Sequence, residues 1–232
     1  MVKAVVVVGH QPYSLSVAKA AERLEGEVDV RMFYMWDLRE RPEEFERAMR
    51  EADFAVLSVM DTGAARAVDL DALAEETPFV AVHSCFEVMR ASFKSLGLEG
   101  SRLFRFLRRM MEGRRDNLSG VRMDEALERG AKLAERMGWF GALKRLKIAM
   151  RAFRYWDYGG ADNVENLLLY LARELADADV REPDPPREIP SRALYDPERG
   201  LVGEDFLGKL REEYGTLVPV TFYKFFYANG NL

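Results

Sequence analysis

The sequence has 232 residues, of which 48% are hydrophobic and 31% charged, and its formal net charge is −5. This composition is typical of a globular protein with one large domain or two small ones, and it excludes wholesale disorder. No apolar run approaches the roughly 20 residues that a transmembrane helix needs. The opening residues lack the layout of a signal peptide, and the single cysteine, Cys85, cannot form an internal disulfide. We therefore expect a cytoplasmic protein without a membrane span that is not a general polyanion binder.

The charge is unevenly distributed along the chain. Between Arg102 and Arg154 there are 15 Lys and Arg residues against 6 Asp and Glu, whereas the rest of the chain has 19 against 33. This distribution indicates a basic helical region, which faces either solvent alone or an anionic ligand or partner.

The first hundred residues alternate between strand and helix patterns. The run Lys3–Val8 is rich in valine without polar alternation, which is typical of a parallel strand buried on both faces. Four strand–helix units in succession predict an α/β fold with a parallel, doubly wound, flavodoxin-like sheet. The predicted strands are Lys3–Val8, Val28–Trp36, Phe54–Met60 and Pro78–Val82, and the first three helices are Ser14–Leu24, Pro42–Met49 and Asp69–Glu76.

The rest of the chain has a different organisation. Helical spacing dominates from Phe86 to about Leu175, and four closely spaced prolines after Asp177 predict an extended connector. A short helix is predicted at Phe206–Tyr214. We expect an α/β domain at 1–100, a helical segment at 101–176, the connector and short helix at 177–216, and at 217–232 a strand that either begins a further domain or returns to the first sheet.

Polar side chains follow the predicted strands. Ligands of open α/β sheets bind beyond the carboxyl ends of the strands, and imidazole serves both as a metal ligand and as an acid–base group. One interpretation is a metal or acid–base cluster of His10, Asp61, His83 and Cys85. The alternative is that the histidines form ordinary loop hydrogen bonds and that the cysteine is a packed small side chain. The sequence has no GxGxxG, GxxxxGK[ST], GxSxG or HExxH motif.

A basic helix leads into an aromatic cluster. Aromatic rings beside a cationic helix face would suit a planar ligand edged with carboxylates, although a helix–turn–helix joint with aromatic packing explains the same pattern. The basic residues are Lys144, Lys147, Arg151 and Arg154, and the aromatic residues are Tyr155 and Trp156.

A diglycine, Gly159 and Gly160, separates this helix from the next. Asp162 is predicted to be the N-cap of the second helix, with Glu165 at the capping-box position. The backbone N–H groups of such a helix start can hold an anion.

The segment Gly159–Ala172 resembles the diglycine and double-asparagine segment in the N-terminal region of the large subunit of cobaltochelatase and magnesium chelatase. Gly159, Gly160, Asn163 and Asn166 match that motif. The preceding helix, which ends at Met150–Trp156, resembles the basic aromatic helix of the family. The later segment Ala193–Pro197 resembles a family element of the form G-(I/L)-(Y/W)-(H/D)-P, with alanine in place of its glycine. The segment Val218–Leu232 resembles the strand that starts the next domain of the family.

The resemblance implies a part of, or a split subunit of, a chelatase large subunit that binds a tetrapyrrole for ATP-driven insertion of cobalt or magnesium, as in cobalamin or chlorophyll-type biosynthesis. It implies no cofactor in this chain, ATP and Mg on partner ATPase subunits, and cobalt or magnesium as the substrate metal. It also implies that the remaining large-subunit domains are partners and that this chain alone does not insert metal. No catalytic residue is carried over, and the four motif residues are interpreted as structural or interface residues.

Two alternatives come from other functional classes. One is a stand-alone α/β protein that binds a metal or small molecule at the His10 and His83 edge. The other is a nucleic-acid-binding module on the basic helices, which the pI of 5.4 disfavours.

Overall fold

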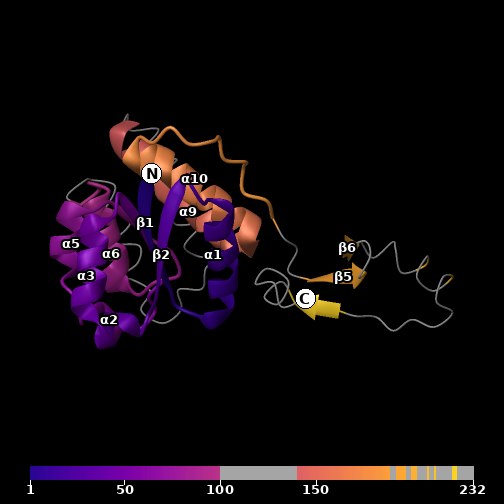
Figure 1. The fold of residues 1–232 in the computed structure, drawn as a ribbon, viewed down its shortest axis with the longest axis horizontal. Helices are drawn as coiled ribbons and strands as arrows, with labels where there is room; N and C mark the ends of the chain where they lie inside the picture. Colours follow the sequence, from indigo (N-terminus) through magenta and orange to yellow (C-terminus); the bar gives the residue numbers. More distant parts are fainter. Residues whose placement is uncertain are drawn as a thin grey trace.

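The computed structural model describes residues 1–99, 140–188, 192–196, 200–202, 208, 212 and 221–223. Its main sheet has four parallel strands in the order β2-β1-β3-β4 (Figure 1). The strands are β1 (Val2–Val8), β2 (Val28–Tyr34), β3 (Phe54–Leu57) and β4 (Phe79–Ala81). The predicted α/β fold with a parallel, doubly wound sheet is therefore confirmed. The helical pattern at 101–139 lies outside the described residues, and so does the helix expected at Phe206–Tyr214 except for residues 208 and 212.

Strand β1 is buried on both faces of the sheet. Successive side chains of a strand point to opposite faces, and both faces of β1 are apolar. Ala4, Val6 and Val8 join one buried cluster, while Val5 and Val7 join the other. Because water reaches neither face, the strand needs no polar alternation.

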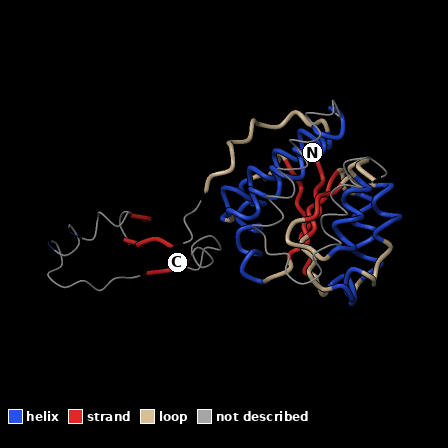
Figure 2. Tube along the Cα trace, turned by 180° about the vertical axis from the view of Figure 1, so that it is seen from behind, coloured by secondary structure: helices blue, strands red, loops and turns tan. Residues whose placement is uncertain are grey.

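Helices cover both faces of the sheet, and they lie on opposite sides of it in both views (Figures 1 and 2). One layer contains α1 (Gln11–Arg23), α9 (Phe140–Tyr158) and α10 (Gly160–Ala176). The other contains α3 (Pro42–Glu51), α5 (Leu70–Glu76) and α6 (Phe86–Ser95). Two short helices that the sequence analysis missed, α2 (Asp37–Glu40) and α4 (Thr62–Ala65), follow β2 and β3.

Helix α10 packs against α1 and completes the first helical layer. Its buried stripe contains Val164, Leu167, Leu168 and Leu171, as the helical spacing predicts. These side chains belong to the same cluster as Val6 of β1. The helices after residue 140 therefore share a hydrophobic core with the residues of the parallel sheet.

The predicted N-cap of α10, Asp162, is wrong by three residues. The helix begins at Gly160, its N-cap is Gly159, and no side chain caps it. Gly159 and Gly160 have φ values of 69° and 83°, which side chains with a Cβ rarely adopt. This backbone turns the chain directly from α9 into α10, so Asp162 lies inside the first turn instead of at the cap.

After α10 the chain runs back in an extended segment, residues 177–188, which we call the strap. Asp177 ends the helix in the left-handed conformation, with φ 48°. The strap has neither helix nor strand and follows the helical layer (Figure 2, tan). An extended, proline-containing path is what the composition predicts here.

A second sheet follows the strap. Its antiparallel strands are β5 (Arg192–Asp196), β6 (Gly200–Val202) and β7 (Thr221–Tyr223), in the order β6-β5-β7. The strand expected within 217–232 is therefore present as β7, and it pairs with β5 instead of returning to the first sheet. Within the described ranges, no helix combines the length and apolarity needed to span a bilayer.

Candidate functional site

The loops after the four parallel strands form the carboxyl edge of the sheet, which comprises residues 9–13, 35–39, 58–63 and 82–86. In doubly wound sheets, ligands bind at this edge where the strand order reverses. Here that position lies between β1 and β3, because β1 pairs with both β2 and β3. The predicted residues His10, Asp61 and His83 all belong to this edge.

His10 lies at the point of reversal. Its Nε2 atom is 3.3 Å from Sδ of Met60, which follows β3. Gly9 permits the close approach of the two strand ends, because a Cβ at this position would lie 2.8 Å from the carbonyl oxygen of Ser58. The structure thus places an exposed imidazole beside an exposed thioether.

Asp61 makes its contacts with other groups. It caps α4 by accepting a hydrogen bond from the Gly63 amide at 2.7 Å, and its second oxygen lies 2.6 Å from a guanidinium nitrogen of Arg39. Both carboxylate oxygens therefore have partners, and the charge is matched by an arginine.

His83 is separated from His10 because β3 lies between β1 and β4. Its Nε2 atom is 3.4 Å from Oδ1 of Asp157 in the last turn of α9, and its ring packs edge-on against Phe153. The residue has a φ of 44°, an unusual backbone conformation outside glycine. Within residues 1–99 and 140–188, no group of three or more His, Cys, Asp and Glu side chains is arranged to hold a metal ion.

Cys85 precedes α6 as its N-cap residue, and its amide donates to the carbonyl oxygen of Val59. Burial is the main reason that the pKa of the thiol is raised. A raised pKa leaves less thiolate at neutral pH, so this environment does not activate the sulfur as a nucleophile.

Tyr155 and Trp156 lie in the core and not on a surface. Both are almost completely buried, and the Trp156 indole stacks on Tyr13 with ring centroids 5.2 Å apart. The Tyr155 hydroxyl donates to the carbonyl oxygen of Asp184 in the strap. In this structure the two rings join α9 to α1 and to the strap.

The four basic residues of α9 are not equivalent. Arg151 stacks over Tyr170, 4.6 Å from the ring centroid, and donates to the Tyr155 hydroxyl at 3.2 Å. Burial raises the pKa of Tyr170 to about 12, although nearby Arg151 opposes the rise. Lys144 pairs with Glu174 at 3.6 Å. Lys147 and Arg154 are exposed.

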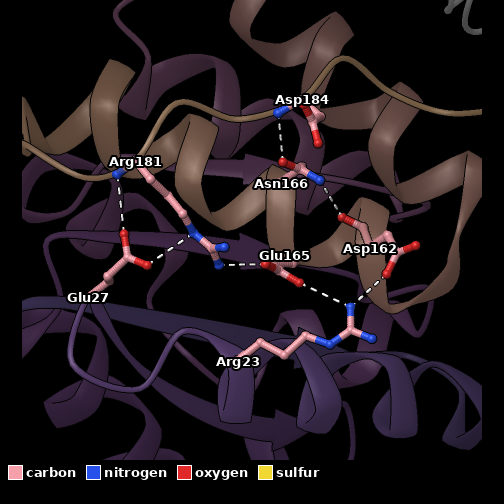
Figure 3. A network of polar contacts seen from close by, with 7 residues as sticks. All are labelled: Arg23, Glu27, Asp162, Glu165, Asn166, Arg181 and Asp184. Carbon is pink, nitrogen blue, oxygen red and sulfur yellow. Dashed lines mark hydrogen bonds and ion pairs between the residues drawn. The ribbon is translucent and has the colours of Figure 1, made fainter.

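The two motif asparagines bind the strap (Figure 3 shows Asn166). Asn163 is buried; its amide nitrogen donates to the carbonyl oxygens of Gly159 and Arg187, and its oxygen accepts from the Arg187 amide. Asn166 donates to the carbonyl oxygen of Asp162 and accepts from the Asp184 amide at 2.7 Å. Their spacing is explained by these contacts, since residues three apart lie on the same side of a helix.

A chain of ion pairs lies beside Asn166 (Figure 3). Arg23 of α1 pairs with Asp162 at 2.6 Å and Glu165 at 3.1 Å. Glu165 also pairs with Arg181 of the strap, whose Nε atom lies 3.0 Å from Glu27. Asp162 and Glu165, which the sequence predicted as a capping pair, instead connect α10 to α1 and to the strap.

The carboxyl edge also has an apolar component that the sequence patterns did not reveal. Trp36, Met60 and Phe86 follow three different strands and are 39%, 56% and 42% exposed. Trp36 is held by stacking on Tyr34, with centroids 4.6 Å apart. The available signal was a large apolar residue within five residues of the end of β2, β3 and β4.

Comparisons with known proteins bear on these features. The family model described as CobN/Magnesium Chelatase matches residues 153–232, which confirms the resemblance seen in the sequence. Among solved structures, the catalytic subunit of cobaltochelatase from Mycobacterium tuberculosis is similar, with 14% identity and a TM-score of 0.46 over 84% of this chain. The chain spans 12% of the length of that protein. A comparison with curated protein sequences gave no match.

Proposed function

We propose that this chain, whose residues 153–232 match the CobN/magnesium chelatase family, is part of a chelatase large subunit or a separate subunit of one. In this role it binds a tetrapyrrole, into which partner subunits drive the insertion of cobalt or magnesium with ATP. The family match is the observation that carries the proposal. The metal is a substrate here and not a resident cofactor of the chain.

The packing extends the proposal beyond the matched segment. The match includes the end of α9, the diglycine, α10 and the strap. Helix α10 shares its core with β1, and the strap is joined to α1 and to Glu27 through Arg181 and Glu165. The parallel sheet and the matched helices are thus one packed unit, which supports a common role for both.

The side chains of the carboxyl edge indicate which step of the reaction this chain performs. The titratable residues of the carboxyl edge are distributed among separate partners, and no catalytic residue is assigned to them. We therefore infer a binding and docking role for this chain, with insertion dependent on the remaining large-subunit domains and the ATPase subunits.

Absorbance spectroscopy tests the proposal. The full chain is titrated with a free-base tetrapyrrole, and the bound complex is then given cobalt(II) or magnesium without partner subunits. We expect saturable binding of the tetrapyrrole. We also expect metal insertion, seen as the spectrum of the metallated ring, to be no faster than it is without protein. Absence of binding, or insertion by the chain alone, would contradict the proposal.

A further inference from the structure

The carboxyl edge of the parallel sheet carries apolar side chains that remain well exposed, namely Trp36, Met60 and Phe86. We propose that this edge is the binding surface for the flat face of the macrocycle, with Trp36, Met60 and Phe86 as its apolar contacts and His10 as a donor available to a metal at the ring centre. The inference rests on the proposed function for the identity of the ligand.

The strand ends line up the side chains of the proposed surface. The order β2-β1-β3-β4 places Trp36, His10, Met60 and Phe86 in that sequence across the edge, each within five residues of the end of its own strand. With neighbouring strands about 4.8 Å apart, the outer two loops are about 14 Å apart. This span suits a tetrapyrrole macrocycle with its peripheral groups, and it is centred on the β1–β3 position where ligands of such sheets bind.

Trp36 presents a flat surface in a fixed orientation. Tyr34 stacks on its ring with an interplanar angle of 7°, which fixes the orientation of the indole while leaving 39% of the residue exposed. Aromatic rings in this state offer contact area at little further cost in conformational entropy. Met60 adds an exposed, adaptable thioether beside the imidazole of His10.

The charge at this edge also fits a tetrapyrrole. A tetrapyrrole combines an apolar face with carboxylates at its rim. Arg39 lies at the same edge, and its side chain is half exposed although one of its nitrogens pairs with Asp61. Both oxygens of Asp61 are already occupied, and its negative charge is paired with Arg39. The remaining donors of the Arg39 guanidinium can bind a ligand carboxylate, because an arginine side chain carries five N–H groups.

The test uses the full chain with two probes, free-base protoporphyrin IX and zinc(II) protoporphyrin IX. The first variant is Trp36→Ser combined with Phe86→Ser, and both positions are exposed enough to tolerate serine. The matched control is Lys147→Ala combined with Arg154→Ala on the exposed side of α9. Affinity is measured by titration of the Soret band, and circular dichroism checks the fold of each variant.

We expect the edge variant to bind free-base protoporphyrin IX about tenfold more weakly or worse, and the α9 control to bind like the unmodified chain. His10→Ala should abolish the red shift that imidazole ligation produces in the zinc probe while leaving the affinity for the free base within about threefold. If the unmodified chain binds and the edge variant binds equally well, the location is wrong and the proposed function stands. If the unmodified chain binds neither probe, the proposed function fails together with the location.

Discussion

The Asn163 side chain binds both backbone polar groups of Arg187, at 2.8 Å to its carbonyl oxygen and 2.9 Å to its amide. One buried amide therefore holds the strap as a neighbouring strand would, and a second bond to the Gly159 carbonyl oxygen ties it to the diglycine. The family motif in this chain is thus a joint between α9, α10 and the strap. This interpretation explains why an amide is required, since donor and acceptor are used together.

Replacement of Asn163 by aspartate tests this joint. The carboxylate would keep the acceptor but face the carbonyl oxygens of Gly159 and Arg187 without a proton to donate. Because the side chain is buried, we expect a loss of about 3 kcal/mol in the free energy of unfolding, measured by urea denaturation. Asn166→Asp is the matched control at a more exposed position and should cost about 1 kcal/mol. Equal losses of unfolding free energy for the two variants would contradict the claim that the burial of Asn163 makes its hydrogen bonds more costly to break.

The diglycine is the second feature open to test. Gly159 has φ 69° and ψ −173°, a region occupied almost only by glycine, so Gly159→Ala should destabilise the protein by about 1–3 kcal/mol. Gly141 lies in α9, and an added Cβ there would meet nothing within 4 Å. Gly141→Ala should therefore stabilise the helix by about 0.5–1 kcal/mol. The unfolding temperature should fall for Gly159→Ala and rise for Gly141→Ala. A shift in the same direction for both variants would contradict the claim that the backbone at position 159 requires glycine.

The ion-pair chain predicts a ranking of two carboxylates. Glu165 lies between Arg23 and Arg181 with a side chain that is 13% exposed, whereas the Asp162 side chain is 69% exposed. Glu165→Gln should lower stability by about 1 kcal/mol and Asp162→Asn by no more than about 0.5 kcal/mol, because exposed pairs contribute little. Raising the salt concentration should narrow the difference between each variant and the unmodified chain. Denaturation at two ionic strengths measures both effects.

Tyr170 predicts a loss of stability in alkali. Its pKa in the folded protein is raised to about 12 from 10.0, chiefly by burial. The neutral phenol is therefore favoured by folding: the contribution is complete below about pH 10 and is lost as the pH rises through about 12. Tyr170→Phe should flatten the decline in unfolding free energy over this interval. If the unfolding free energy of Tyr170→Phe falls as steeply with pH as that of the unmodified chain, groups other than Tyr170 cause the loss of stability.

Local patterns were sufficient to predict much of the fold. The unbroken run Val5–Val8 identified a strand buried on both faces, and the spacing of Val164, Leu167, Leu168 and Leu171 identified the buried side of α10. Both features depend on neighbours within a few residues. The start of α10 was misplaced because two glycines with positive φ replace the side-chain cap that the sequence suggested.

The contacts of the candidate site could not be predicted from the sequence, because they join residues that are far apart along the chain. The partners of His83 and His10 depend on strand order, since β3 separates the two strand ends. Periodicity carries no information on that order. The bonds of Asn163 to Arg187 likewise join residues 24 positions apart, and the spacing of neither residue indicates the other.

A reconstituted insertion assay tests the central claim most directly. Cobalt or magnesium insertion into a free-base tetrapyrrole is followed by absorbance with ATPase subunits and the other large-subunit domains, in the presence and absence of this chain. We predict ATP-dependent metallation only when the chain is included. Metallation at the same rate without it would contradict a chelatase role for the protein.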